Sequence, residues 1–181
     1  MARFLLTIFL VLVAQHSWAN DWQALRAPGA VVLMRHALAP GTGDPAHFDV
    51  ARCDTQRNLD ARGRAQAQAI GQMLAGRSIQ FDQVFSSQWC RCRDTAQLLA
   101  LGQVQDHPAL NSFFQNYGAE AAQTQAAMRL VQDNAGKRLL LVTHQVNIRA
   151  LTGVGARSGE MIVAQLREGR LQVTGRVMIA P

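Results

Sequence analysis

Hydrophobic residues in this chain fall into short continuous runs, separated by longer stretches with helical periodicity. The short runs, bounded by turn residues, predict buried strands at residues 30–34, 83–86 and 138–143. The amphipathic stretches predict helices at residues 60–77, 89–101 and 119–134, with a fourth helix after residue 144. Asp60 and Ser87 are expected to cap the first two helices. Two last strands, at about residues 160–166 and 170–179, are expected to form a hairpin.

Strands that alternate with helices predict an α/β fold, a three-layer sandwich with a mostly parallel central sheet. Polar pairs follow three of the predicted strands: Arg35-His36, Ser86-Ser87 and Thr143-His144. Ligands of parallel sheets bind just beyond the carboxyl ends of the strands. We therefore expect these pairs to meet at one edge of the sheet and to form the functional site.

The first 19 residues have the three-part pattern of a secretory signal. Arg3 is followed by the apolar stretch Phe4–Ala14, and Ser17-Trp18-Ala19 places small residues at the cleavage positions. The run is shorter than the roughly 20 apolar residues that span a bilayer. We predict a signal peptide at 1–19, one domain at 20–181, and a periplasmic or secreted protein that does not span the membrane after cleavage. A buried N-terminal element and an uncleaved anchor are the alternatives.

Arginine dominates the positive charge of the chain. Removal of residues 1–19 would leave 17 basic and 12 acidic side chains, a net charge of +5, and Lys137 is the one lysine in the sequence. The guanidinium group suits bidentate recognition of phosphate. The arginines are scattered rather than grouped in one polybasic run, so we expect no nucleic-acid partner.

Three cysteines, Cys53, Cys90 and Cys92, form no CxxC motif and have no histidine pair at zinc spacing nearby. No metal site is therefore expected. In an oxidising compartment Cys53 can pair with either of the other two, and one thiol stays free. Cys90 and Cys92 would point to different sides of a helix, which disfavours a bridge between them.

The residues at the predicted strand ends suit phosphoryl transfer. Arg35 and Arg91 can hold phosphate oxygens bidentately. A neutral imidazole can attack phosphorus and carry the phosphoryl group as a covalent intermediate. A second histidine can donate to an oxygen on which charge develops.

Four segments, in order, resemble the motifs of the histidine phosphatase (phosphoglycerate mutase-like) superfamily. They are Leu33-Met34-Arg35-His36-Ala37, Asn58–Gly63 with Gln66-Ala67, Phe85-Ser86-Ser87 with Arg91–Ala96, and Leu141-Val142-Thr143-His144. The resemblance covers roughly residues 30–155. It implies a phosphoglycerate mutase-like fold, His36 as the nucleophile, and a phosphate pocket completed by Arg35, Arg91 and His144. It implies no metal and no organic cofactor.

The general acid of this family has no obvious counterpart here. Many members carry a glutamate where this chain has Ser112, and another branch carries an aspartate where it has Gln145. Glu120 is the candidate substitute acid, with Asp44 and Asp49 as alternatives. The lack of an assigned acid also resembles the small phosphohistidine phosphatases, whose leaving group needs little protonation.

The sequence favours an exported phosphatase that acts on a phosphomonoester. Its expected partner is a phosphorylated small molecule or an envelope glycolipid. Arg57, with Arg52 of the same loop, is a candidate contact for a second anionic group of the substrate. Four aromatic residues are candidates for the wall of a sugar or lipid pocket: Trp89, Phe113, Phe114 and Tyr117. Two alternatives stay open: a protein phosphohistidine phosphatase, and a phosphate-binding module without catalysis. The sequence leaves the oligomeric state undetermined.

Overall fold

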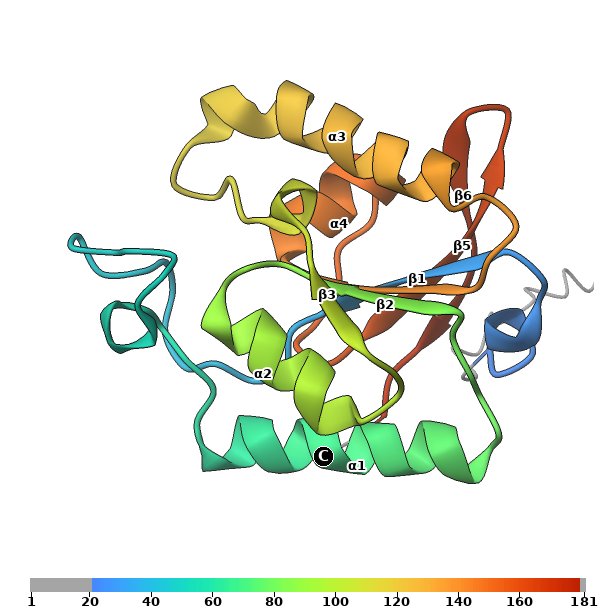
Figure 1. Cartoon of the computed structure of the whole chain (residues 1–181), viewed down its shortest axis with the longest axis horizontal. Helices are drawn as coiled ribbons and strands as arrows, with labels where there is room; N and C mark the ends of the chain where they lie inside the picture. The colour runs from blue at the N-terminus through green and yellow to red at the C-terminus, as the bar shows by residue number, and fades with distance from the viewer. Residues whose placement is uncertain (1–20, 180–181) are drawn as a thin grey trace, which may run out of the picture.

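The computed structural model describes residues 21–179, which form a six-stranded sheet with helices on both faces (Figure 1). The predicted signal peptide lies outside the described residues. The strands are β1 (Ala30–Arg35), β2 (Gln83–Ser86), β3 (Val104–Asp106), β4 (Leu139–Thr143), β5 (Met161–Arg167) and β6 (Arg170–Val177). No helix in this part of the chain is long and apolar enough to cross a membrane.

The sheet has the order β3-β2-β4-β1-β5-β6. The first four strands in this order run parallel, whereas β5 is antiparallel to β1 and forms a hairpin with β6. The predicted α/β sandwich with a mostly parallel sheet is confirmed. The sequence interpretation missed β3, because this edge strand has only three residues and none of them is buried.

Four α-helices connect the strands, close to the predicted bounds. They are α1 (Ala61–Gly76), α2 (Cys90–Leu99), α3 (Glu120–Asp133) and α4 (Gln145–Thr152). Single-turn 3-10 helices lie at Ala24–Arg26, Cys53–Thr55, Pro108–Leu110 and Tyr117–Ala119. Asp60 caps α1 as predicted, because its carboxylate accepts a hydrogen bond from the backbone N–H of Gly63 at 2.7 Å. The prediction that Ser87 caps α2 is wrong: the helix begins at Cys90, and the N-cap residue is Trp89.

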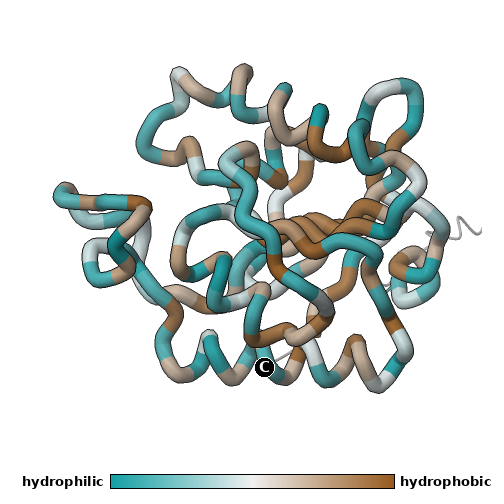
Figure 2. Tube along the Cα trace, in the orientation of Figure 1, coloured by the Kyte–Doolittle hydropathy of each residue, from teal (hydrophilic) through white to brown (hydrophobic). Residues whose placement is uncertain are grey.

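Alternating strand residues feed two separate hydrophobic cores. Val32 and Met34 of β1 face α1 and α2, whereas Val31 and Leu33 face α3 and α4. Figure 1 shows the helices as one pair on each face of the sheet, and Figure 2 shows the hydrophobic strands between them. Both faces of the central strands are buried, which explains why their sequences are continuous apolar runs.

The long connection at residues 37–58, hereafter the β1–α1 loop, projects from the body of the molecule (Figure 1). A disulfide joins Cys53 of this loop to Cys90 at the start of α2, so one of the two predicted pairings is present. Cys92 is free and buried. The beginning of the loop also packs closely against α1. The backbone of Leu38 lies so near Gly63 that a Cβ atom at position 63 would be 1.9 Å from the Leu38 carbonyl oxygen. The β1–α1 loop is therefore anchored near both of its ends.

Candidate active site

The carboxyl ends of β1, β2 and β4 bring the predicted polar pairs together. The backbone N–H of His36 donates to the carbonyl of Thr143 at 3.0 Å, which links the ends of β1 and β4. The rings of His36 and His144 meet edge to face with centroids 5.5 Å apart. The convergence expected from the strand order is thus present in the structure.

His36 is almost completely buried, with 2% of its surface exposed. Its Nδ1 lies 2.7 Å from the carbonyl oxygen of Ala37, so this nitrogen carries the proton and donates. The lone pair is then on Nε2, which has no hydrogen-bond partner among residues 21–179. Burial, followed by the positive charge of Arg91, holds the pKa of His36 well below its usual value of 6.5. His36 is therefore neutral at pH 7 and has an available lone pair.

His144, which follows β4, contacts side chains from α2 and from the segment after β2. Its Nε2 lies 2.9 Å from the hydroxyl of Ser87 and 3.5 Å from the thiol of Cys92. Its Nδ1 lies 3.5 Å from Nη2 of Arg91. Burial and the charge of Arg91 keep the pKa of His144 well below 6.5, so this imidazole is also neutral.

Arg91 lies beside both histidines and forms a bidentate ion pair with Asp44 of the β1–α1 loop. Nη1 is 2.7 Å and Nη2 is 3.1 Å from the two carboxylate oxygens. The same carboxylate accepts hydrogen bonds from the indole N–H of Trp89 and the backbone N–H of Arg57. Burial raises the pKa of Asp44, but the hydrogen bonds and charge of Arg91 outweigh it and leave the pKa below its usual value.

Two further arginines complete the positive end of the site. Arg35 donates to the carbonyl of Ala156 at 3.2 Å, and its buried Nε has no partner. Arg57 donates through Nε to the carbonyl of Gly43 and through Nη1 to that of Ala39. Both side chains line the same cavity as His36. Arg57 thus both stabilises the β1–α1 loop through hydrogen bonds and lines the cavity.

A cavity of about 690 Å³ opens from these residues toward the surface. Its inner end is formed by Arg35, His36, Arg57, Arg91 and His144. Its outer end is formed by one face of α4 and by five residues before or at the start of α3: Ser112, Phe113, Phe114, Tyr117 and Glu120. The outer wall includes Phe114 and Tyr117, with 43% and 57% of their surfaces exposed. The cavity is much larger than a phosphate group and can receive a ring-sized substituent.

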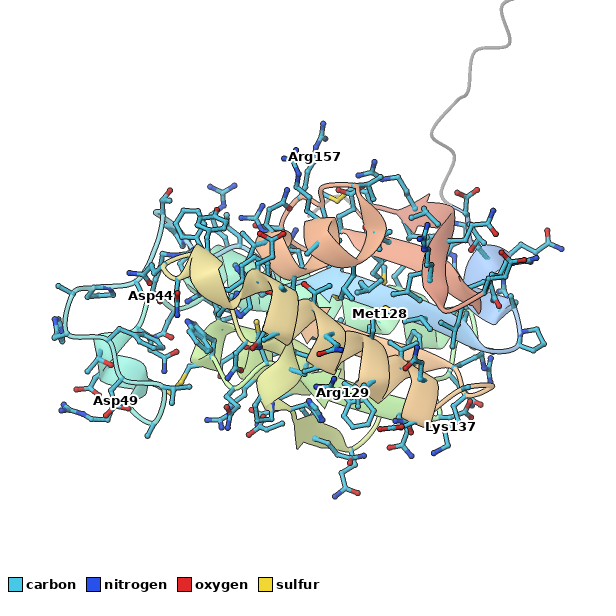
Figure 3. All side chains as sticks on the ribbon, turned by 90° about the horizontal axis from the view of Figure 1, so that it is seen from above. Asp44, Asp49, Met128, Arg129, Lys137 and Arg157 are labelled. Carbon is cyan, nitrogen blue, oxygen red and sulfur yellow. A yellow bond between two sulfur atoms is a disulfide. The ribbon has the colours of Figure 1, made fainter. Side chains whose placement is uncertain are left out.

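Only some of the candidate acids lie at the cavity. Glu120, the first residue of α3, lines it together with Ser112 and Gln145. Asp44 lines it too, but its carboxylate is bound by Arg91. Asp49 does not line the cavity; it is exposed, and its carboxylate accepts from the backbone N–H of Ala51. Figure 3 shows Asp44 where the β1–α1 loop meets the body and Asp49 at the outer part of that loop.

Sequence reasoning missed two parts of the site. The hydroxyl of Ser87 contacts His144 instead of simply capping a helix, and Asn111 is 3.2 Å from the same hydroxyl. From the sequence, Asp44 is a candidate acid only, whereas in the structure it binds Arg91. The position of Ser87 just after a strand could have indicated its contact with His144. No sequence pattern predicts the ion pair between Asp44 and Arg91. Residues 21–179 contain no group of three His, Cys, Asp or Glu side chains arranged to hold a metal ion.

A family model, that of the histidine phosphatase superfamily (branch 1), matches residues 31–118. Among curated proteins, the mitochondrial serine/threonine-protein phosphatase Pgam5 of Drosophila ananassae is 35% identical over 69 residues. This match includes 38% of the present chain and 21% of the fly protein, so the chain spans about a fifth of that relative's length.

Two solved structures share the fold. The protein histidine phosphatase SixA, solved with tungstate, superposes with a TM-score of 0.60 and 16% identity over 82% of this chain and 96% of SixA. Phosphoserine phosphatase of Entamoeba histolytica, solved with 3-phosphoglyceric acid, gives 0.61 and 17% identity over 83% and 97%. The family match at residues 31–118 contains the β1 and α2 parts of the site.

Proposed function

The chain belongs to the histidine phosphatase superfamily, and we propose that it hydrolyses a phosphomonoester through a phosphohistidine intermediate on His36. The observation that carries the proposal is the geometry of His36: a buried, neutral imidazole whose Nδ1 donates to a carbonyl and whose Nε2 is left with its lone pair. A nucleophile for phosphorus at neutral pH needs this state.

The phosphoryl group binds at the inner end of the cavity. Arg35 and Arg91 each have a buried Nε without a partner, and Arg57 lines the same space. Guanidinium groups around a dianion supply the charge stabilisation on which phosphoryl transfer mostly depends. The arriving negative charge also favours protonation of His144, which adds a positive charge to the inner end of the cavity.

In the first step, Nε2 of His36 forms a bond to phosphorus while the bond to the leaving oxygen breaks. The electron pair goes to the leaving oxygen, which takes a proton from Glu120. In the second step, a water molecule attacks phosphorus and gives a proton to Glu120, and the P–N electron pair returns to Nε2. Glu120 is assigned this role because it lines the cavity and, unlike Asp44, has no ion pair there.

The outer end of the cavity favours a sugar phosphate as substrate. Exposed Phe114 and Tyr117 offer faces on which a sugar ring can stack. Arg149 of α4 also lines the cavity, and its side chain makes no hydrogen bond to the described part of the chain, so it can donate to hydroxyl groups. An envelope sugar phosphate or glycolipid has these properties.

Export is the second part of the proposal. It is supported by the signal-like pattern of residues 1–19 and by the disulfide between Cys53 and Cys90, since disulfides persist mainly in oxidising compartments. We predict a mature protein that begins near Asn20 in the periplasm. N-terminal sequencing of the exported protein tests this, and a membrane-bound chain that retains Phe4–Ala14 would contradict it.

A protein phosphohistidine phosphatase is the second candidate function. The shared fold with SixA favours it, as does the serine at position 112, where many relatives have an acid. Such a substrate has a good leaving group and would not need Glu120. The two candidates therefore differ in their dependence on the general acid.

The test is a screen of the purified mature protein against sugar phosphates, phosphorylated envelope fragments and a phosphohistidine peptide. With a ³²P-labelled substrate, rapid quenching should trap a phosphoenzyme that is labile in acid and stable in base, as a phosphoramidate is. Absence of both turnover and label with every substrate would overturn the proposal and leave a binding module.

A further inference from the structure

The ion pair between Arg91 and Asp44 is the best-enclosed pair of charges in the described part of the chain. Each side chain is only 3% exposed. Asp44 belongs to the β1–α1 loop and Arg91 to α2, so the pair joins segments 47 residues apart in sequence. Removing two charges from water is costly unless geometry and further hydrogen bonds compensate for it. A buried ion pair is therefore weak evidence for a role in stability, and a role in the site has to be considered.

The four N–H groups on the terminal nitrogens of Arg91 are almost all in use. Nη1 donates to Asp44 and to the carbonyl of Arg57, and Nη2 donates to the other carboxylate oxygen of Asp44. One N–H of Nη2 remains, and this nitrogen lies 3.5 Å from Nδ1 of His144. Asp44 therefore orients the guanidinium of Arg91 so that the remaining N–H of Nη2 faces His144.

Asp44 also changes the charge that a substrate meets. Arg35, Arg57 and Arg91 carry three positive charges around the inner end of the cavity, and Asp44 reduces their sum to two. A phosphomonoester at neutral pH is close to a dianion. The inner end thus matches the charge of its proposed ligand.

An aspartate on this arginine can have either of two roles: it can occupy the phosphate position until substrate displaces it, or it can hold the arginine permanently. The contacts favour the second. Four donors hold the carboxylate: Nη1 and Nη2 of Arg91, the Trp89 indole and the Arg57 backbone N–H. Gln115 donates to the Asp44 carbonyl, and the disulfide anchors the same loop. Displacement would break all four carboxylate contacts.

We propose that Asp44 is a positioning residue that orients Arg91 toward His144 and the phosphate, and that stays in place when substrate binds. This inference rests on the proposed phosphatase function, because it assigns Arg91 to the phosphate site.

The test compares D44N with the matched control D49N, which removes a charge from the same loop away from the cavity. Asparagine keeps the shape of the side chain but loses the charge. A misplaced catalytic group costs up to about 100-fold in rate, so we expect kcat of D44N to fall by about 10- to 100-fold. The affinity for vanadate, a phosphate analogue titrated calorimetrically, should fall in parallel. D49N should behave as the wild type, and D44E should recover part of the loss because it restores the carboxylate.

Tighter vanadate binding by D44N would overturn the proposal, because it would mean that Asp44 competes with phosphate. Unchanged kcat and vanadate affinity in a D44N protein that melts at a lower temperature would also overturn it, because Asp44 would then act only in stability. If the wild type binds vanadate but hydrolyses no phosphomonoester, the proposed catalysis fails instead. The vanadate titration still decides the role of Asp44 in that case, because it requires no turnover.

Discussion

The two ends of the cavity differ in how firmly they are built. At the inner end, His36, Arg91 and His144 are 2–4% exposed, and hydrogen bonds to the β1–α1 loop and to Ser87 beyond β2 hold them. At the outer end, Phe114 and Tyr117 lie in the connection between the sheet and α3 and are about half exposed. The inner end is formed in advance, because the sheet and the β1–α1 loop tied by the disulfide determine where its residues lie.

This contrast separates two tasks. Phosphoryl transfer depends on charges and a nucleophile in fixed positions, and a rigid sheet edge supplies them. Recognition of the leaving group depends on loop side chains that can vary without disturbing the core. We therefore expect substitutions at the inner end to change kcat for every substrate, and substitutions at the outer end to change the ranking of substrates.

The largest effect is expected at the inner end, for His36→Ala. Loss of the nucleophile should lower kcat by about 10⁴-fold or more and abolish the acid-labile phosphoenzyme. His47→Ala, a change at an exposed histidine of the β1–α1 loop, is the control and should keep full activity. Rates of His36→Ala comparable with the wild type would disprove the mechanism.

Glu120 lines the cavity and is the proposed general acid, so its substitution should distinguish substrates by their leaving group. General acid catalysis contributes about 10² to 10⁴ in rate. Glu120→Gln should lose about 100-fold or more with a sugar phosphate and less than about 10-fold with p-nitrophenyl phosphate, whose phenolate leaves without protonation. Glu168→Gln, at the exposed β5–β6 turn, is the control. Equal losses on both substrates would exclude Glu120 as the acid.

The buried histidines should also make the free energy of unfolding depend on pH. In the unfolded chain, His36 and His144 bind protons as the pH falls below about 6.5, whereas the folded protein keeps both neutral to a lower pH. The folded state is therefore stabilised at neutral pH and loses free energy of unfolding as the pH falls from 7 toward the folded-state pKa values. The slope is at most about 1.4 kcal/mol per pH unit for each histidine.

Urea unfolding at several pH values between 7.5 and 5 measures this slope. His36→Asn should reduce it by the contribution of one histidine. A slope that is the same in the wild type and in His36→Asn would show that His36 titrates normally in the folded protein.

The smallest effect is expected at the outer end, for Tyr117→Ala. Loss of a stacking face worth about 0.5–1.5 kcal/mol should raise KM for a sugar phosphate by about 2- to 10-fold. KM for acetyl phosphate, which has no ring, should stay unchanged. Met73→Ala, at an exposed hydrophobic residue of α1, is the control. An equal rise in KM for both substrates would mean that Tyr117 does not contact the leaving group.

The same division explains what could be predicted from the sequence. Continuous apolar runs identify buried strands, and topology then places Arg35-His36 and Thr143-His144 at one edge. The contact of Asp44 with Arg91 depends on the path of a 22-residue loop, which periodicity does not encode. Ser87 satisfied the usual rule for an N-cap, but the hydroxyl is bound to His144, and tertiary contacts overrode the local preference.

The bridge between Cys53 and Cys90 makes the manner of preparation a variable in every experiment on this protein. It attaches the loop that carries Asp44 to the residue directly before Arg91. A sample produced in a reducing cytosol lacks this covalent tie, and its β1–α1 loop relies on weaker contacts to keep its place. Activities should be compared only between samples of equal thiol content, with one titratable thiol per chain, that of Cys92, in the oxidised protein.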